Sequence, residues 1–353
     1  MSRLDTIRAL AAEHDADAAI VTHPPSLRWA LGFTGSNGLL IVTPDAAHFV
    51  TDGRYTSQAA TEVTDADVHV APASLAVYAS EHRLLGAVKR VVVAGDHLTV
   101  SAHRKLGEAL SVELVAVDAL LSRAVAQKDE AAIAAVAAAQ ALTCEVFESI
   151  LPSLAPGVTE QAIAAEVVYQ HLKRGASAMS FEPIVASGPR GALPHARPSS
   201  RTLAPGDLVV LDMGGVLDGY CSDLTRTVAV GEPGQEARTA YAVVQQAQRS
   251  AIEAARAGIT GKDLDAVARD VIQAAGLGDA FSHSLGHGVG LEVHEWPRVS
   301  AQADDTLPAG ATITIEPGVY LDGQFGIRIE NVIVLREDGC DDLTPLSTDL
   351  VVV

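Results

Sequence analysis

The sequence predicts two domains: an α/β domain over residues 1–121, followed by an α+β domain over residues 122–353 that contains an internal pseudo-twofold repeat. Three observations lead to this prediction. The chain has 353 residues, of which 48% are hydrophobic, and this is ample for more than one core. Its first third alternates short apolar runs with helical stretches. Its remainder contains two segments that align without gaps, as a duplicated unit would.

The first domain is predicted from the order of its segments. The helical stretches are RLDTIRALAAEH and AHRKLGEAL, and the apolar runs typical of strands are AAIVT, GLLIVT, HFVTD, RVVVAG and ELVAV. From about Ser122 the composition changes to a long Ala-rich stretch, KDEAAIAAVAAAQALTCEVFESIL, whose apolar spacing fits one helical face. We therefore place the domain boundary between residues 121 and 122.

The second domain shows the same helix signal twice. In APGVTEQAIAAEVVYQHLKRG, Thr159 is a helix N-cap, Glu160 suits the first turn, and a basic pair followed by glycine marks the end. RAGITGKDLDAVARDVIQAAG repeats this signal with Thr260 at the cap position. The repetition indicates that the second domain is duplicated.

Two hairpins in the second domain carry acids at equivalent positions. The segment LAPGDLVVLDMGGVLDG aligns on LPAGATITIEPGVYLDG, which puts Asp212 on Glu316. Each copy is an apolar run, an acid and an Asp-Gly pair, which is a strong hairpin signal. A returning strand brings a second acid, Asp223 in YCSDLTRT and Glu330 in GIRIENVIV. A pseudo-twofold axis would bring all four carboxylates to one point.

The spacing of these acids predicts how they meet. Glu316 and Glu330 would face each other directly across a hairpin centred on Gly323, whereas Asp212 and Asp223 need a register offset or a bulge. Buried carboxylates raise one another's pKa, so a bound cation is the natural way to keep four of them ionised. The alternative for any single acid is a solvated strand face or a turn cap. Repetition at equivalent positions favours convergence on a metal.

Histidines would supply the nitrogen ligand of such a site. His283, His287 and His294 lie within FSHSLGHGVGLEVHE, and His195 lies apart from them in GALPHARPSS. A structural role is the alternative for each. The spacing of His283 and His287 is helical but lacks the glutamate of an HExxH zinc motif. The glycines of this segment indicate a close backbone approach to a neighbouring group.

Taken together, these segments resemble the pita-bread metallopeptidases, which include aminopeptidase P, prolidase and methionine aminopeptidase. LDMGGVLDGYCSDLTRT is similar to the family segment with two aspartate ligands, HSLGHGVGLEVHE to its histidine segment, and ITIEPGVY and GIRIEN to its two glutamate segments. The resemblance implies a pita-bread (creatinase/aminopeptidase) catalytic domain: a strongly curved antiparallel sheet backed by helices. It also implies five ligands of a dinuclear metal site, namely Asp212, Asp223, His287, Glu316 and Glu330.

Four carboxylates and one imidazole suit Mn²⁺, Co²⁺ or Zn²⁺, and we expect two divalent ions, with Mn²⁺ placed first. Two such ions about 3.5–4 Å apart lower the pKa of a bridging water and polarise a carbonyl. The resemblance implies that Asp223 and Glu330 bridge the ions, that Asp212 binds mainly one ion, and that His287 and Glu316 bind the other. Glu316 would also carry a proton from the nucleophilic water to the leaving nitrogen.

The resemblance further implies residues that act on the substrate. His294 and His195 resemble histidines that donate hydrogen bonds to the developing oxyanion or hold the substrate. His283 would be a residue of the substrate pocket. Arg328 lies two residues before Glu330 on the same strand, shares its face, and would orient a bridging carboxylate. A plain surface arginine is the alternative for Arg328.

The implied reaction is hydrolysis of the Xaa-Pro bond, in dipeptides or at the N-terminus of short peptides. This bond lacks an N–H, and its proline ring fixes φ, so it requires a dedicated pocket. The histidines and Tyr320 would contribute walls to it. The short chain favours a prolidase, whereas the FTGSNG loop (33–38) favours an aminopeptidase P; its segments LGFTGSNG and TDGRYTSQA resemble a creatinase-like N-terminal domain.

Two other function classes remain open at this point. A creatinase-like C–N hydrolase would use the same fold without metals, and a non-catalytic module would use it to bind peptides. Neither requires all five ligand residues, none of which is replaced in this chain. Metal analysis followed by assays on Ala-Pro, Ala-Pro-Ala and creatine would discriminate among the three classes.

Composition bears on partners and location. A net charge of −19 would repel nucleic acid and anionic lipid headgroups. No uninterrupted apolar run approaches a membrane span, and the N-terminal stretch carries charge throughout, so we expect a cytoplasmic protein. The three cysteines lack CxxC pairing and are expected to be small buried hydrophobes. The resemblance implies a homodimer.

Overall fold

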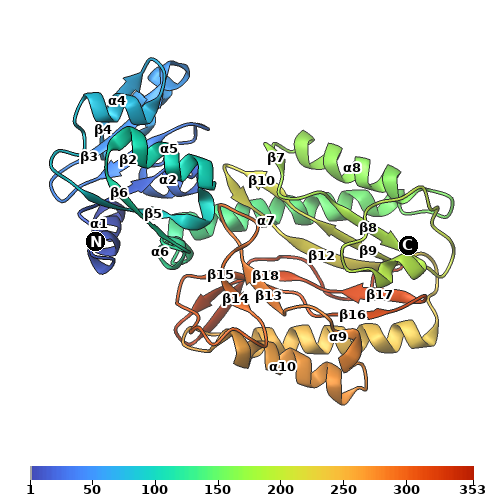
Figure 1. The fold of residues 1–353 in the computed structure, drawn as a ribbon. Coiled ribbons are helices and arrows are strands. Elements are labelled where there is room, and N and C mark those ends of the chain that lie inside the picture. The colour runs from blue at the N-terminus through green and yellow to red at the C-terminus, as the bar shows by residue number, and fades with distance from the viewer. Residues whose placement is uncertain (1) are drawn as a thin grey trace. The chain divides into compact units, whose positions relative to one another are not determined.

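The computed structural model describes residues 2–353, which form two compact units. The first unit ends at Val125, and the second is Ala126–Val353. This division lies close to the predicted boundary at residue 121. Each unit has hydrophobic clusters of its own and is described separately (Figure 1).

The first unit is a mixed sheet in the order β4-β3-β2-β1-β5-β6, with helices on its faces. Pairing is parallel for β1–β5, β5–β6 and β3–β4, and antiparallel for β1–β2 and β2–β3. The strands are β1 (Ala18–Val21), β2 (Leu39–Val42), β3 (Ala47–Asp52), β4 (Asp67–Ala71), β5 (Arg90–Ala94) and β6 (Glu113–Val117). The helices are α1 (Arg3–Glu13), α2 (Pro24–Leu31), α3 (Thr56–Glu62), α4 (Leu75–Glu81), α5 (Val100–Leu110) and α6 (Ser122–Ala126).

Alternation along the strands builds two cores, one on each face of this sheet. Ala19 and Val21 of β1 belong to the cluster that contains Ile7 of α1, whereas Ile20 belongs to the cluster that contains Leu110 of α5. Successive strand residues point to opposite faces, so a run without polar residues must be covered on both. All five predicted apolar runs are strands, which confirms the α/β prediction for this unit.

The FTGSNG loop is held by side chains of the first unit. Thr34 donates from its hydroxyl to Glu62 at 2.7 Å, and Asn37 donates to Asp52 at 2.6 Å. The hydroxyls of Ser36 and Tyr55 lie 2.6 Å apart. The loop is therefore an ordered part of this unit.

In the second unit, two pairs of helices flank layers of strands: α7 and α8 lie on one side and α9 and α10 on the other (Figure 1). The helices are α7 (Glu130–Ile150), α8 (Glu160–Lys173), α9 (Gln235–Ala254) and α10 (Gly261–Ala274). Strands of the first half are β7 (Ala178–Met179), β8 (Ile184–Ser187), β9 (Leu208–Met213), β10 (Gly215–Leu217), β11 (Tyr220–Cys221) and β12 (Leu224–Ala229). Those of the second half are β13 (Gly286–Gly288), β14 (Glu295–Val299), β15 (Thr312–Ile315), β16 (Gly318–Leu321), β17 (Phe325–Arg328), β18 (Asn331–Arg336) and β19 (Gly339–Asp342).

The two halves of this unit repeat one plan, which confirms the predicted duplication. Thr159 and Thr260 are the N-caps of α8 and α10, and each accepts a hydrogen bond from the backbone in the first helical turn. Thr159 also forms a β-bridge with Thr202, and Thr260 forms one with Thr306. Both bridges lie immediately before the aligned hairpin segments, so the repeat includes the helix as well as the hairpin.

The hairpin turns follow the predicted Asp-Gly pairs. In the first hairpin Asp218 and Gly219 both have positive φ, 45° and 71°, as a tight type I′ turn requires. In the second hairpin Gly323 has φ 71° and lies at the centre of the β16–β17 pairing. These turns set the register of the strands that carry the acids.

Helix α7, with the turn that follows it (Glu130–Ser153), is long and apolar enough to cross a membrane by length and composition alone. Of its most apolar window, 56% is buried inside the protein. Val146, Phe147 and Ile150 pack in one cluster with Val209 of β9 and Leu224 of β12. We therefore interpret α7 as a core helix of the second unit.

The halves are joined behind the acids by Arg226, which is 2% exposed. Its guanidinium donates to the Glu330 carbonyl at 2.6 Å and to the Asn331 side chain at 2.9 Å. It also donates to the carbonyls of Leu346 and Ser347 at 3.1 and 3.0 Å. One arginine of β12 thus fixes the start of β18 and the C-terminal segment.

Replacing Arg226 with Met should lower the free energy of unfolding by about 3 kcal/mol or more, because several buried carbonyls lose their donor at once. Urea unfolding followed by circular dichroism measures this change. Arg249→Met, at an exposed position on α9, is the matched control and should stay within about 0.5 kcal/mol. Equal stability of the two variants would contradict this role for Arg226.

Candidate metal centre

Three of the four predicted acids, Asp223, Glu316 and Glu330, lie just outside the paired strands, and Asp212 lies near the end of β9. Ile315 pairs with Asn331, and Gly318 pairs with Arg328 in the same register, so Glu316 and Glu330 face each other directly. This confirms the expected pairing across Gly323.

The acids of the first hairpin are offset from each other. Asp212 of β9 pairs with Thr225, so Asp223 lies two residues away from the position opposite Asp212. The sequence prediction of an offset is therefore correct. The offset places Asp223 beside the histidine strand of the other half.

Backbone contacts fix Asp223 from behind. The buried Gln140 of α7 donates to the Asp223 carbonyl at 2.8 Å and accepts from the Asp223 N–H at 3.1 Å. Beside it, the Ser222 hydroxyl lies 2.7 Å from that of Thr143 and accepts from the Gly215 N–H at 2.9 Å. A buried side-chain amide thus satisfies both backbone groups of Asp223 and leaves its carboxylate free to face the cavity.

Thr225 and Arg328 organise the remaining acids. The Thr225 hydroxyl donates to Glu330 Oε2 at 2.8 Å, and Arg328 Nε lies 3.1 Å from the same hydroxyl. Arg328 Nη2 donates to Asp212 Oδ2 at 2.5 Å and Nη1 donates to the Tyr320 hydroxyl at 2.7 Å. Arg328 was expected to orient a bridging carboxylate. It instead binds Asp212, because its long side chain crosses to the other hairpin; nor is it a surface arginine, since it is buried.

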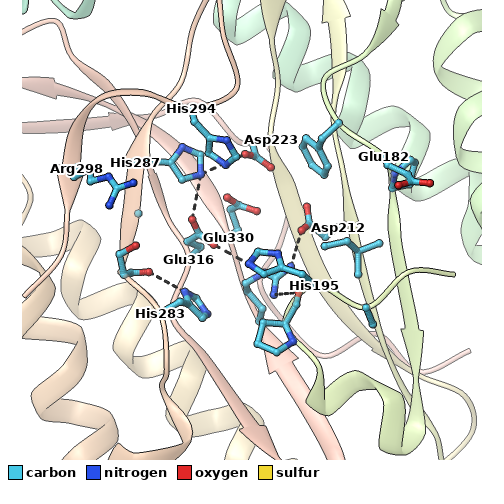
Figure 2. A pocket seen from close by; sticks show the side chains of 18 of the residues that line it. Glu182, His195, Asp212, Asp223, His283, His287, His294, Arg298, Glu316 and Glu330 are labelled. Carbon is cyan, nitrogen blue, oxygen red and sulfur yellow. Dashed lines mark hydrogen bonds and ion pairs between the residues drawn. The ribbon is translucent and has the colours of Figure 1, made fainter. Parts of the chain in front are cut away.

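His287 is the histidine that lies among the acids (Figure 2). Its Nε2 is 3.3 Å from Glu316 Oε1 and 3.7 Å from Asp223 Oδ2. Its Nδ1 lies 3.1 Å from the Gly288 carbonyl, which we assign as the acceptor of an Nδ1–H. Once Nε2 has lost its proton to a binding metal, this arrangement directs its lone pair at the acids, as metal coordination requires.

The other histidines line the same cavity without joining the acids. The His294 ring packs edge-on against the His287 ring, with centroids 4.4 Å apart. His283 Nε2 lies 2.8 Å from the Tyr320 hydroxyl, and its Nδ1 lies 2.8 Å from the Ser284 carbonyl. His195 is exposed to the cavity from the segment between β8 and β9.

The spacing of His283 and His287 would fit a helix, but the histidine segment is not helical. It enters the short strand β13. The glycines of this segment allow the backbone of neighbouring strands to approach closely, as the sequence predicted. A Cβ on Gly286 or Gly288 would collide with the backbone of Thr314 or Trp296. At Gly290 the neighbour is Lys128, whose ammonium forms a buried ion pair with Glu295 at 2.9 Å.

Crowding of the acids shifts the pKa values of these groups. Burial, followed by the charges of Glu330 and Asp212, raises the pKa of Asp223 well above its ordinary value. Burial and the charge of Glu316 raise the pKa of Glu330 to about 8. Burial also raises the pKa of Glu316, but His287 outweighs it and lowers that pKa overall. His287 itself is held at a pKa of about 9, because Glu316 overcomes the effect of burial.

Two further observations indicate that these carboxylates and His287 could bind a metal. Asp212 Oδ1 is buried and has no hydrogen-bond partner among residues 2–353. Asp223, His287 and Glu330 each offer a ligand atom, and these atoms lie within 4.8 Å of one another. Oxygen donors with one imidazole suit divalent ions such as Mn²⁺ or Zn²⁺. The assignment of individual residues to individual ions stays a prediction.

The acids form the floor of a cavity of about 830 Å³ that is lined by all the predicted ligands, by the four predicted histidines and by Arg328. Tyr320, predicted as a wall, is not among the lining residues but contacts His283. In Figure 2, Glu182 lies beyond Asp212, and Arg298 lies on the opposite side, beyond His287. The lining at the Glu182 side includes Phe181 and Ile184. The cavity therefore extends past the acids in two directions, as a substrate with groups on both sides of the reacting bond requires.

Sequence reasoning missed Arg298 and Gln140. Arg298 is exposed in the cavity and forms no ion pair within the described part of the chain. The sequence offered one signal for Arg298: it is a basic residue in an acidic protein, only four residues after the candidate site residue His294. For Gln140 the signal was a polar residue on the apolar face of the predicted Ala-rich helix.

Comparisons with known proteins agree with this geometry. The model of metallopeptidase family M24 matches residues 134–337, and the model of the creatinase/prolidase N-terminal domain matches residues 3–124. An uncharacterised peptidase of Bacillus subtilis is 36% identical over 99% of this chain and 100% of its own. The Xaa-Pro dipeptidase of Pyrococcus furiosus is 44% identical over 59% of this chain and 61% of its own.

Solved structures also resemble the whole chain. The Xaa-Pro dipeptidase from Bacillus anthracis superposes with a TM-score of 0.97 at 33% identity, covering 99% of both chains. The X-Pro aminopeptidase from Thermotoga maritima gives a TM-score of 0.91 at 36% identity, covering 98% of this chain and 100% of that one. The pita-bread architecture, with a creatinase-like N-terminal domain, is thereby confirmed.

Metal-free protein should lose stability as pH rises from about 6 to about 8. Glu330, with its pKa raised to about 8, keeps a proton in the folded state that the unfolded chain releases near pH 4. His287, with its pKa raised to about 9, acts in the same direction. The folded state binds more protons in this window, so its stability falls with pH.

A divalent ion replaces those protons, so Mn²⁺ should raise Tm more at about pH 8 than at about pH 6. Differential scanning calorimetry with and without Mn²⁺ measures both effects. Glu330→Gln should flatten the pH dependence of the metal-free protein. A Tm of metal-free wild type that rises across this window would contradict the crowding of the acids.

Proposed function

Because this chain belongs to metallopeptidase family M24, we propose that it hydrolyses the Xaa-Pro bond of proline dipeptides, in preference to the N-terminal Xaa-Pro bond of longer peptides. The observation that carries this proposal is that both hairpins direct their acids, with His287, to the floor of one cavity that extends on either side of them. The dipeptidase and aminopeptidase names of the relatives support the substrate class.

We propose that Asp212, Asp223, His287, Glu316 and Glu330 hold two divalent ions, Mn²⁺ first, with Co²⁺ and Zn²⁺ as alternatives. Asp223 and Glu330 would be shared, since their ligand atoms and that of His287 lie together. Bound there, the ions would activate a water and polarise the scissile carbonyl. The residues around them supply the proton transfer and the orientation.

Glu316 carries the proton in this account. It faces Glu330 across the hairpin and lines the cavity, so its carboxylate is placed to accept a proton from the attacking water. The leaving group is the proline nitrogen, which must be protonated because an amide anion is too basic to depart. Glu316 delivers that proton as the C–N bond breaks.

Histidines stabilise the oxyanion. Burial lowers the pKa of His294, so its ring is neutral near pH 7 and offers one N–H donor. His195 reaches the same cavity from the other half of the domain. Hydrogen bonds from such donors strengthen as negative charge develops on the carbonyl oxygen. His283 is bonded to Tyr320 and Ser284, and we assign it to shaping the pocket wall.

Arg328 and Tyr320 act through other groups. Arg328 fixes the orientation of Asp212 and donates to the Tyr320 hydroxyl, which in turn lies against His283. This chain of contacts links a ligand of the first hairpin to a histidine of the second half. We assign Arg328 to holding Asp212 in place and offsetting one carboxylate charge.

Arg298 favours dipeptides. The proline of an Xaa-Pro dipeptide ends in a carboxylate, and an unpaired guanidinium at one side of an acidic cavity is the group that would bind it. In a longer peptide that position is a neutral amide. The metal-free C–N hydrolase is disfavoured, because the intact donor set would have no role in it.

We also propose a cytoplasmic homodimer. The cysteines are free thiols, two of them buried, as in a reducing compartment. Dimerisation is carried over from the resemblance. Sedimentation at the 36.6 kDa monomer mass across micromolar concentrations would contradict the dimer.

Glu316→Gln should reduce turnover of Ala-Pro by about 10²–10⁴-fold, because the amide cannot carry a proton, and loss of the charged ligand adds to this. Asp218→Asn, in the turn of the first hairpin, is the control and should stay within a few fold. Initial rates are compared at equal metal content. A Glu316→Gln protein that cleaves Ala-Pro at the wild-type rate would show the proton-transfer assignment to be wrong.

Arg298→Met should lower kcat/KM for Ala-Pro about 10- to 100-fold, the effect of losing one charge-assisted bond. The loss should be much smaller for Ala-Pro amide and Ala-Pro-Ala, which lack a carboxylate at that position. Steady-state kinetics on the three substrates measure the difference. Equal losses on all three would indicate that Arg298 does not select dipeptides.

A further inference from the structure

The segment that carries His195 is irregular. Between β8 and β9, residues 187–199 (the His195 segment) contain a 3₁₀ turn at Gly188–Ala192 and several prolines, but neither α-helix nor strand beyond Ser187. Pro194, His195 and Arg197 nonetheless line the cavity. A donor on an irregular segment contributes to catalysis only if other contacts hold that segment to within a fraction of an ångström.

Glu160, the first residue of α8, holds both ends of this segment. Its side chain is fully buried. Oε1 accepts from the Ser187 N–H and the Ser187 hydroxyl, both at 2.8 Å. Oε2 accepts from the Ser199 N–H at 2.9 Å and from the Ser199 hydroxyl at 2.6 Å. One carboxylate therefore joins residues that lie twelve positions apart in the chain.

Arg190 extends the hold to the middle of the segment. Its Nε donates to Glu160 Oε2 at 3.0 Å, and its Nη2 donates to the Arg197 carbonyl at 2.6 Å. Arg197 is two residues from His195. A continuous path of hydrogen bonds thus runs from the buried carboxylate to the backbone beside the histidine.

These contacts require a carboxylate. Every group that faces Glu160 is a donor, so both oxygens must accept. Burial raises the pKa of Glu160, but the hydrogen bonds from Ser199 and Ser187 outweigh it, and the pKa stays below the ordinary value. Glu160 is therefore ionised at neutral pH. A glutamine would turn an NH₂ group towards one set of these donors.

The other half of the domain contains the same device. Asp265 of α10 is buried and accepts from the Leu285 N–H at 3.0 Å and from Arg269 Nε at 2.7 Å. Arg269 also donates to the His283 carbonyl at 3.0 Å. In each half, a buried acid on the second helix, with an arginine, holds the irregular segment that carries a cavity histidine. Neither acid lines the cavity.

We propose that Glu160 is a positioning residue, which acts on the reaction by holding the His195 segment so that His195 meets the substrate. The proposal rests on the function proposed above, because it assigns His195 to the oxyanion. A purely structural Glu160 would stabilise the fold without any dependence on His195, and this difference can be measured.

The test is a double-mutant cycle of Glu160→Gln and His195→Ala, assayed on Ala-Pro at equal metal content. Glu160→Gln alone should lower kcat/KM at least about tenfold, since displacements near 1 Å can cost about 10²-fold. In the His195→Ala background the same change should cost less than about twofold. Glu166→Gln, on the same helix and away from the segment, is the control and should leave kcat/KM unchanged. Equal costs in the two backgrounds would overturn the proposal.

Hydrogen–deuterium exchange separates this inference from the proposed function. Glu160→Gln should accelerate exchange in residues 187–199 and leave the hairpin strands unchanged. If wild-type protein does not cleave Xaa-Pro substrates, the proposed function is wrong. If exchange in residues 187–199 is unchanged in Glu160→Gln, Glu160 does not hold the His195 segment, whatever the activity. If Glu160→Gln does not fold, Arg190→Met replaces it in both measurements with the same expected outcomes; it removes the bonds from Arg190 to Glu160 and to the Arg197 carbonyl but keeps those from Ser187 and Ser199 to Glu160.

Discussion

Repulsion among buried carboxylates is the constraint on which the second unit depends. Asp212, Asp223, Glu316 and Glu330 converge because both hairpins carry their acids at or near the ends of paired strands, and without compensation the group could not stay ionised. The protein offsets two charges with its own cations: Arg328 against Asp212, and His287 against Glu316. The pKa values of Asp223 and Glu330 remain raised. Divalent ions would allow these two carboxylates to ionise.

The other polar residues around the acids bind mainly backbone groups rather than the carboxylates. Gln140 satisfies the N–H and carbonyl of Asp223, and Arg226 binds the carbonyl of Glu330. The main chains of Asp223 and Glu330 are therefore fixed, and their carboxylates face the cavity; Glu330 Oε2 also accepts from the Thr225 hydroxyl. Glu160 does the same for an irregular segment at the edge of the cavity. Buried polar groups of this kind are costly unless every partner is present, so they stabilise one arrangement strongly.

The sequence predicted the features that depend on local pattern. Helix caps, Asp-Gly turns and the spacing of Glu316 and Glu330 depend on neighbours in the chain, and the structure confirms them. Features that depend on long side chains crossing between elements were not predictable. Arg328 was expected to bind a bridging carboxylate and binds Asp212 of the other hairpin instead. Strand β4 was missed because its DVHVA sequence is polar at an edge of the sheet. The partners of Glu160 lie too far along the chain for spacing to indicate them.

The central claim is that this group of acids, with His287, exists to hold two divalent ions. Anomalous diffraction from crystals soaked in Mn²⁺, recorded on both sides of the manganese absorption edge, tests it most directly. We expect two anomalous peaks about 3.5–4 Å apart, both in contact with Asp223 and Glu330. One peak would disprove a dinuclear centre. Peaks only outside the cavity at saturating Mn²⁺ would contradict the whole account of the site.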